Sequence, residues 1–157
     1  MKILYLYISS YKFGSGHLKR AEIYQKKFKE KKIYFKKKNL INFQNKLDIE
    51  IKKIIKQIQH SDYVFLDVSN KFFLSKFICN FLRQILSINS KKFIIIDGLN
   101  EEILTNKLRY QYKAIIIPYF FKKKFLNKIK KVKYFLGPEF FMIDILNKYN
   151  IKNKFDK

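Results

Sequence analysis

Residues 3–20 read ILYLYISSYKFGSGHLKR, and this segment decides the fold. An apolar run, Ile3 to Ile8, is followed by a glycine turn that includes Gly14, Ser15 and Gly16, and then by an amphipathic stretch from Leu18 to Phe28. This order is typical of a buried strand, a tight turn and a helix. Such a turn can hold an anion, because glycines let backbone N–H groups approach it and the helix N-terminus adds partial positive charge. His17, at the expected helix start, is a candidate general base beside that anion.

The rest of the chain alternates short apolar runs with longer stretches in which apolar residues recur every three or four positions. The expected strands are Lys2–Ile8, Tyr63–Asp67, Phe93–Asp97, Ala114–Ile117 and Lys133–Leu136, and Ile33–Phe35 is either a weak strand or a loop. The expected helices are Leu18–Lys31, a segment around Leu47–Ile58, Lys71–Leu86, Glu101–Leu108 and Phe140–Tyr149. Strand–helix alternation with unbroken apolar strands predicts an α/β fold, a Rossmann-like parallel sheet with helices on both faces.

Several polar residues fall where strands of this sheet are expected to end. The glycine turn, Asp67 and Asp97 each follow the last residues of an apolar strand. Because ligands of such sheets bind beyond the carboxyl ends of the strands, we expect one rim to gather a histidine, two acids and a glycine turn. The 157 residues suffice for one domain, and neither an internal repeat nor a domain boundary is evident.

The charge of the chain invites a nucleic-acid interpretation, which we do not favour. Lysine and arginine total 35 against 12 acids, giving a net charge of +23. The lysines are scattered over expected helix faces and turns, in a composition rich in Ile, Asn, Phe and Tyr that is typical of A/T-biased coding. Arginine, the residue best suited to base and phosphate recognition, occurs only at Arg20, Arg83 and Arg109. We therefore expect mostly solvated lysines, with attraction to an anionic membrane surface or acidic ligand as the alternative and specific nucleic-acid binding as the least favoured interpretation.

The sequence carries no sign of membrane insertion or export. The most apolar windows, Phe93–Ile96 and Ala114–Phe121, have the length of strands and are flanked by charge. The first residues lack the pattern of a signal peptide, and the single cysteine fits a reducing compartment. We expect a cytoplasmic protein, with peripheral contact at the inner face of the membrane left open.

The segment from Phe13 to Arg20 resembles the GxGHxxR turn of the PseG/SpsG-like sugar-nucleotide hydrolases, which are similar in fold to MurG-type GT-B glycosyltransferases. Three further segments follow in the expected order and resemble a strand-end aspartate, an "(I/F)DD" turn and an "LGpkYaLL" segment of that family. They are Phe65–Asp67, Ile95–Leu99 and Leu136–Ile143. The resemblance covers nearly the whole chain.

This resemblance implies a function in bacterial surface glycan biosynthesis, such as the pseudaminic acid pathway. The implied reaction is hydrolysis of a UDP-2,4-diacetamido-2,4,6-trideoxy sugar, with His17 activating water for attack on C1 of the sugar and UDP leaving. Gly14, Ser15 and Gly16 would offer backbone donors to the substrate, and Arg20 would orient the turn or approach the substrate. Asp67 and Asp97 complete the expected substrate-binding set. Neither a metal ion nor a cofactor is expected.

The chain departs from the family pattern in sequence and in length. Leu6 and Ile8 stand where the family often has Arg and Asp, Gly98 replaces the second acid of the "DD" pair, and Asp144 stands where an Arg is expected. A GT-B protein has two Rossmann-like domains, whereas residues 1–157 match the N-terminal one. We therefore expect a single half of a GT-B fold, whose activity needs a second domain or subunit.

Each signal also has a structural interpretation. The GSGH stretch is also compatible with a tight turn capped by Ser15, although the functional interpretation is favoured; Asp67 and Asp97 are equally compatible with strand-end residues that bond the following loops. His60, at the end of an amphipathic segment, is interpreted as a structural residue of a helix C-terminus. The alternative function is accordingly a non-catalytic half-domain, or the partner-binding subunit of a split glycosyltransferase.

Overall fold

The computed structural model describes residues 1–11, 15–43, 48–68, 76–96, 112–117 and 133–136. In these ranges the strands form one sheet in the order β2-β1-β3-β4-β5-β6, and every neighbouring pair is parallel. The strands are β1 (Lys2–Tyr7), β2 (Tyr34–Asn39), β3 (Tyr63–Asp67), β4 (Phe93–Ile96), β5 (Ala114–Ile117) and β6 (Tyr134–Leu136). The helices are α1 (Gly16–Glu30), α2 (Asp48–Gln59) and α3 (Lys76–Asn89), with 3₁₀ turns at Leu40–Phe43 and Ser90–Lys92.

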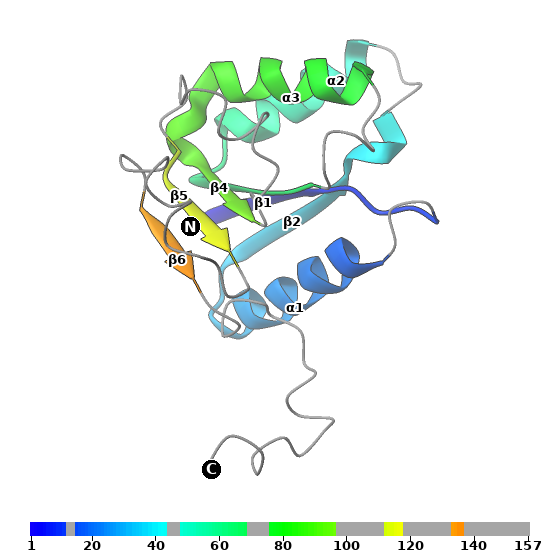
Figure 1. Cartoon of the computed structure of the whole chain (residues 1–157). Helices are drawn as coiled ribbons and strands as arrows, with labels where there is room; N and C mark the ends of the chain where they lie inside the picture. The colour runs from blue at the N-terminus through cyan, green and yellow to red at the C-terminus, as the bar shows by residue number, and fades with distance from the viewer. Residues whose placement is uncertain (12–14, 44–47, 69–75, 97–111, 118–132, 137–157) are drawn as a thin grey trace.

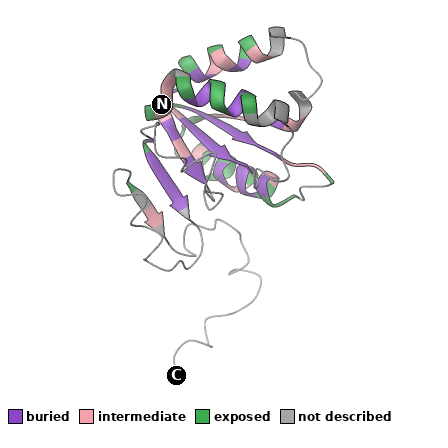
Figure 2. Ribbon diagram, turned by 45° about the horizontal axis from the view of Figure 1, so that its top comes forward, coloured by how far each residue is buried: buried purple, intermediate pink, exposed green. Residues whose placement is uncertain are grey.

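Helices cover both faces of the sheet, as the sequence predicts. Helix α1 lies on one face, and α2 and α3 lie together on the other (Figure 1). The central strands β1 and β3 are almost entirely buried, because the side chains on each face of the sheet are covered by helices (Figure 2). The predicted α/β fold with a Rossmann-like parallel sheet is thus confirmed.

The two layers of the core differ in chemistry. On the α1 side, rings from β1, β2, β3 and α1 pack against one another, with centroids 5.3–6.1 Å apart among Tyr5, Tyr24, Phe28, Phe35 and Phe65. On the α2/α3 side the core is mainly aliphatic and includes Leu4, Leu6, Ile54, Ile58 and Leu82. The α1 layer therefore contains several buried tyrosines, whose hydroxyl groups require partners.

Strand β2 is longer than the sequence predicts. The apolar run predicted a weak strand at Ile33–Phe35, but β2 pairs with β1 from Lys2↔Tyr34 to Tyr7↔Asn39. The strand contains three consecutive lysines, so the hydrophobic pattern did not predict its second half. An edge strand tolerates them because its side chains are only half-buried.

The other boundaries agree with the expectations to within a few residues where the structure describes them. Helix α1 begins at Gly16 rather than Leu18, and β3 and β5 have the predicted bounds. The expected helices at Glu101–Leu108 and Phe140–Tyr149, and the strand end at Asp97, lie outside the described residues.

The strand order creates a switch point between β1 and β3. From β1 the chain passes through α1 on one face to β2, whereas the chain that follows β3 forms α3 on the opposite face (Figure 1). In α/β proteins, ligands commonly bind beyond the carboxyl ends of two strands whose connections diverge in this way. Tyr7 and Asp67 stand side by side at these two ends.

Candidate functional site

The buried face of α1 changes from apolar to polar in its first turn. Ala21 and Tyr24 are buried and Phe28 packs against the same cluster, and the same stripe extended backwards by one turn reaches Arg20 and His17. His17 is 8% exposed and Arg20 is 6% exposed. The periodicity that packs the helix on the sheet therefore carries two basic side chains into the α1 layer, at the carboxyl rim.

Asp67 is the partner of both basic residues. It lies two residues after Phe65 on β3, so the alternation of the strand turns its side chain toward α1, and it is fully buried. Its Oδ1 lies 2.7 Å from Nδ1 of His17. Arg20 binds the carboxylate side-on, with Nε donating to Oδ2 and Nη2 donating to Oδ1, both at 2.8 Å.

Tyr5 completes the cluster and was not predicted as part of the site. Its hydroxyl donates to Oδ2 of Asp67 at 2.7 Å. The sequence held a signal for it: a tyrosine in a fully buried strand needs a hydrogen-bond partner for its hydroxyl, and a strand-end acid on the adjacent strand can supply one. The carboxylate of Asp67 therefore accepts hydrogen bonds from three side chains that lie 62, 50 and 47 residues away in the sequence.

The cluster keeps Asp67 ionised. Burial by itself raises the pKa of Asp67, but hydrogen bonds from His17 and Arg20 and the guanidinium charge outweigh it, so the net pKa lies below its usual range. Burial, followed by the charge of Asp67 and its hydrogen bond, raises the pKa of Tyr5 far above the ordinary value for a phenol. Burial and the Asp67 charge likewise raise the pKa of Tyr24 to about 12. Asp67 and Arg20 are thus a charged pair surrounded by neutral phenols.

An ionised Asp67 fixes the tautomer of His17. Nδ1 lies 2.7 Å from the carboxylate and also 2.8 Å from Nη2 of Arg20. A carboxylate and a guanidinium cannot both bond this atom, because the first only accepts and the second only donates. The proton on Nδ1 therefore points to Asp67, and the Arg20 nitrogen approaches because the two share Oδ1 as acceptor. In the neutral ring Nε2 then carries the lone pair, which is the form required of a general base.

The start of α1 is exposed beside this buried cluster. Ser15 occupies the N-cap position, but its side chain makes no capping hydrogen bond, so the interpretation of Ser15 as a helix cap is wrong. A Cβ added to Gly16 would meet nothing within 4 Å, so packing within the described chain does not require a glycine there. The first turn contains no acidic residue. An exposed helix start of this kind attracts anions.

The structure brings together part of the predicted set. His17, Arg20 and Asp67 share one cluster, with Ser15 and Gly16 exposed at the adjoining helix start. Arg20 and Asp67 were expected to bind substrate, whereas their described contacts are with each other, His17 and Tyr5. Gly14 and Asp97 lie outside the described residues.

His60 is separate from this site. Its Nδ1 donates to the carbonyl oxygen of Lys56 at 2.7 Å, which places it at the C-terminal end of α2 as the sequence predicts. Within the described ranges, no group of three or more His, Cys, Asp or Glu side chains is arranged to hold a metal ion. None of the helices in the described part of the chain combines the length and the apolar character needed to span a bilayer.

Comparison with known proteins adds no relative to this picture. The chain matches no family model, no curated protein and no solved structure. The site is therefore interpreted from its own geometry.

Proposed function

We propose that the chain is the N-terminal half of a UDP-sugar hydrolase or related glycosyltransferase of surface glycan biosynthesis, with His17 as its general base. The observation that carries this proposal is the 2.7 Å pairing of His17 Nδ1 with a buried carboxylate at the carboxyl rim. A carboxylate that holds Nδ1–H orients the ring and stabilises the imidazolium that forms when Nε2 accepts a proton. Activity on the complete substrate is expected to need a second domain or subunit that binds the nucleotide.

The proposed reaction is the one that the resemblance implies, with His17 as the base. His17 Nε2 takes a proton from water while the water oxygen bonds to C1 of the sugar. The bond between C1 and the oxygen of the diphosphate breaks, and UDP leaves with the electron pair. The exposed N–H groups at the start of α1 are suited to stabilise negative charge on the substrate, in keeping with the roles proposed for Ser15 and Gly16. Asp67 and Arg20 act as positioning residues behind the base.

The test measures UDP release from a UDP-2,4-diacetamido-2,4,6-trideoxy sugar and from UDP-N-acetylglucosamine. The purified chain is assayed alone and together with the protein encoded by the next reading frame downstream of its gene, because the second half of a split enzyme would be encoded there. We call that protein the downstream product. His17→Ala is expected to lower the rate about 10²- to 10⁴-fold, the range typical of a lost general base. His60→Ala is the matched control, because His60 is the other histidine of the chain and lies away from the cluster.

Added imidazole separates a catalytic role from a structural one. If His17 is the base, imidazole restores part of the activity of a folded His17→Ala variant, and the pH profile of that activity follows the added base. A His17→Ala rate within about threefold of wild type would contradict the proposal.

A second candidate is the non-catalytic half-domain that binds a partner subunit. The observation that favours it is that Asp67 is fully buried and its described contacts are all within the chain, so the cluster also serves to fasten α1 to the sheet. Absence of UDP release under every condition, together with a stable complex with the downstream product, would favour this candidate.

Contact with an anionic membrane surface belongs to the same proposal. Its support is the net charge of +23, which attracts acidic lipid headgroups. Co-sedimentation with phosphatidylglycerol vesicles, but not with phosphatidylcholine vesicles, is the expected result. Equal retention of the chain by both vesicle types would contradict membrane attraction by charge.

A further inference from the structure

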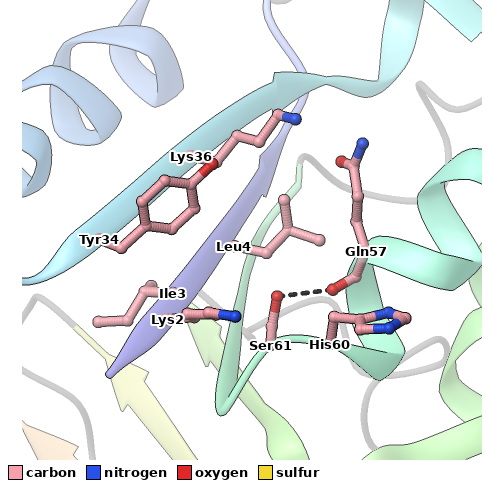
Figure 3. Close-up of a pocket in the computed structure, with 8 residues that line it drawn as sticks. All are labelled: Lys2, Ile3, Leu4, Tyr34, Lys36, Gln57, His60 and Ser61. Carbon is pink, nitrogen blue, oxygen red and sulfur yellow. Dashed lines mark hydrogen bonds between the residues drawn. The ribbon is translucent and has the colours of Figure 1, made fainter.

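A cavity lies at the opposite end of the sheet from the His17 cluster. It has a volume of about 340 Å³ and is formed by the first residues of β1 and β2 together with the end of α2 (Figure 3). Its lining comprises Lys2, Ile3, Leu4, Tyr34, Lys36, Gln57, His60 and Ser61. The volume falls within the range of roughly 300–1,000 Å³ that is usual for small-molecule sites.

The cavity follows from how α2 packs. Ile54 and Ile58 direct the helix onto the aliphatic core of the central strands. Lys36, on the edge strand β2, is the pairing partner of Leu4 on β1, so the two side chains lie on the same face of the sheet, the one that α2 covers. Lys36 is only half-buried. The edge strand is therefore incompletely covered, and the gap opens between it and the helix.

The lining combines an apolar wall with cationic ends. The wall is formed by Leu4, which is almost fully buried, whereas the side chain of Ile3 packs on the α1 side of the sheet; Tyr34 is 61% exposed. In Figure 3 the side chains of Lys36 and Gln57 extend toward one end of the cavity, whereas Lys2 and Ser61 lie toward the other. An apolar surface beside ammonium groups suits a flat ring that carries a negative charge.

Gln57 supplies the decisive observation. Its Oε1 is shielded from solvent and has no hydrogen-bond partner, and it is the one such side-chain atom among the residues the structure describes. The neighbouring polar groups are satisfied locally, because the Ser61 hydroxyl donates to the Gln57 carbonyl oxygen and His60 donates to that of Lys56, both at 2.7 Å. A buried acceptor without a donor is unfavourable. A rotation of the Gln57 amide toward the cavity exposes Oε1, and a ligand that brings an N–H or O–H group there then removes this deficit.

We propose that this cavity binds a small molecule made of a flat ring with an N–H donor and one anionic group. The ring lies against Tyr34 and the aliphatic wall, the anion is attracted by Lys36, and the N–H donates to Oε1 of Gln57. The site is independent of the proposed hydrolase function, because it lies at the amino ends of the strands and shares no residue with the His17 cluster.

Three probes separate these elements of recognition. Indole-3-acetate carries the ring, the donor and the anion. Naphthalene-1-acetate lacks the N–H, and indole lacks the anion. Titrations followed by amide chemical shifts of the labelled chain are expected to show saturable binding of indole-3-acetate, with shifts concentrated in residues 2–4, 34–36 and 57–61. The other two probes are expected to bind at least about threefold more weakly, because each loses one polar contact.

Matched variants assign the contacts. Lys36→Ala is expected to weaken indole-3-acetate binding about fivefold, and Lys38→Ala to change it less than about twofold. Lys38 is the control because it has the same charge, strand and face of the sheet but does not line the cavity. Gln57→Leu is expected to remove the preference for indole-3-acetate over naphthalene-1-acetate.

Three results would overturn the proposal. One is the absence of saturable indole-3-acetate binding, and the second is an equal effect of Lys36→Ala and Lys38→Ala. The third is a preference between the two acetates that survives in Gln57→Leu. In that last case the N–H group of the ligand does not donate to Gln57.

Discussion

Buried polar atoms are bonded differently at the two ends of the sheet, which we call the carboxyl rim, where the strands end, and the amino rim, where they begin. At the carboxyl rim, Asp67 accepts hydrogen bonds from side chains on β1 and α1 that are distant in sequence. At the amino rim the polar groups at the end of α2 bond to carbonyl groups four residues back, and Gln57 Oε1 is left without a partner. The first rim thereby fixes the geometry of a charged group, whereas the second leaves the acceptor Gln57 Oε1 without a hydrogen-bond partner.

The two histidines show what this difference means for reactivity. Both donate a hydrogen bond from Nδ1, His17 to a carboxylate and His60 to a backbone carbonyl. The carboxylate carries charge, so it stabilises a protonated imidazole more than a neutral carbonyl does. The same tautomer is therefore suited to proton transfer at one rim and to ending a helix at the other.

The largest expected effect is the loss of the Asp67 charge. Asp67→Asn leaves the buried guanidinium of Arg20 without its counter-ion, which should lower the free energy of unfolding by about 3–5 kcal/mol. Urea denaturation of both proteins at neutral pH measures this difference. The matched control at the amino rim is Asp62→Asn. Asp62 is exposed and accepts a hydrogen bond from the backbone N–H of Lys2 at 2.7 Å, so this variant should cost less than about 1 kcal/mol. Equal losses would mean that the buried network does not stabilise the fold.

Acid should reduce the difference in unfolding free energy between wild type and Asp67→Asn. Because the folded state lowers the pKa of Asp67, the unfolded chain binds its proton more readily, and the stabilisation is present above about pH 4, the ordinary value for aspartate. It is lost as the pH falls through the lower folded-state pKa. The gap in unfolding free energy between wild type and Asp67→Asn should therefore narrow below pH 4, by at most about 1.4 kcal/mol per pH unit for one proton. A gap that stays constant from pH 6 to pH 2.5 would show that Asp67 does not titrate with folding.

Much of the carboxyl rim was predictable from the sequence because its signals are periodic. The strand, turn and helix of residues 3–20 and the acid at the end of β3 follow from hydrophobic patterns, and parallel pairing then brings His17 and Asp67 to one rim. The burial of Arg20 also agrees with the pattern, since Arg20 adjoins the buried stripe of Ala21 and Tyr24, but its side-on contact with Asp67 was not predicted. The lysine-rich β2 was underestimated because edge strands carry no apolar run.

The amino rim was not predictable for a physical reason. Its cavity depends on the lateral position of α2 over the sheet, which is set by packing of the whole aliphatic layer rather than by any local pattern. The oxygen of Gln57 has no partner, and the neighbouring Ser61 and His60 bond backbone carbonyl groups instead. Tyr5 was overlooked for a different reason, since hydropathy counts tyrosine as one more apolar strand residue.

A smaller effect is expected from removing the unpartnered oxygen at the amino rim. Gln57→Leu replaces a buried acceptor by a side chain of similar size that needs no hydrogen bond, and should raise the free energy of unfolding by about 1 kcal/mol. Gln59→Leu on the same helix is the control. Its side chain is exposed, so the change should stay within about 0.5 kcal/mol. Destabilisation by Gln57→Leu, measured by urea denaturation without ligand, would show that this oxygen is already satisfied in the protein.

The smallest change in stability is expected at Gly16, where it tests what the glycine is for. The position is helical, exposed and open around its Cα, so Gly16→Ala should leave the free energy of unfolding unchanged or raise it by up to about 1 kcal/mol through better helix propensity. If the glycine serves the close approach of a substrate, the same variant should weaken the UDP-sugar activity that depends on His17. Lys19→Ala, in the same turn and exposed, is the control for an ordinary alanine change. A Gly16→Ala variant that is more stable and fully active would show that the substrate does not approach the backbone at Gly16, and it would contradict the substrate-binding role proposed for this glycine.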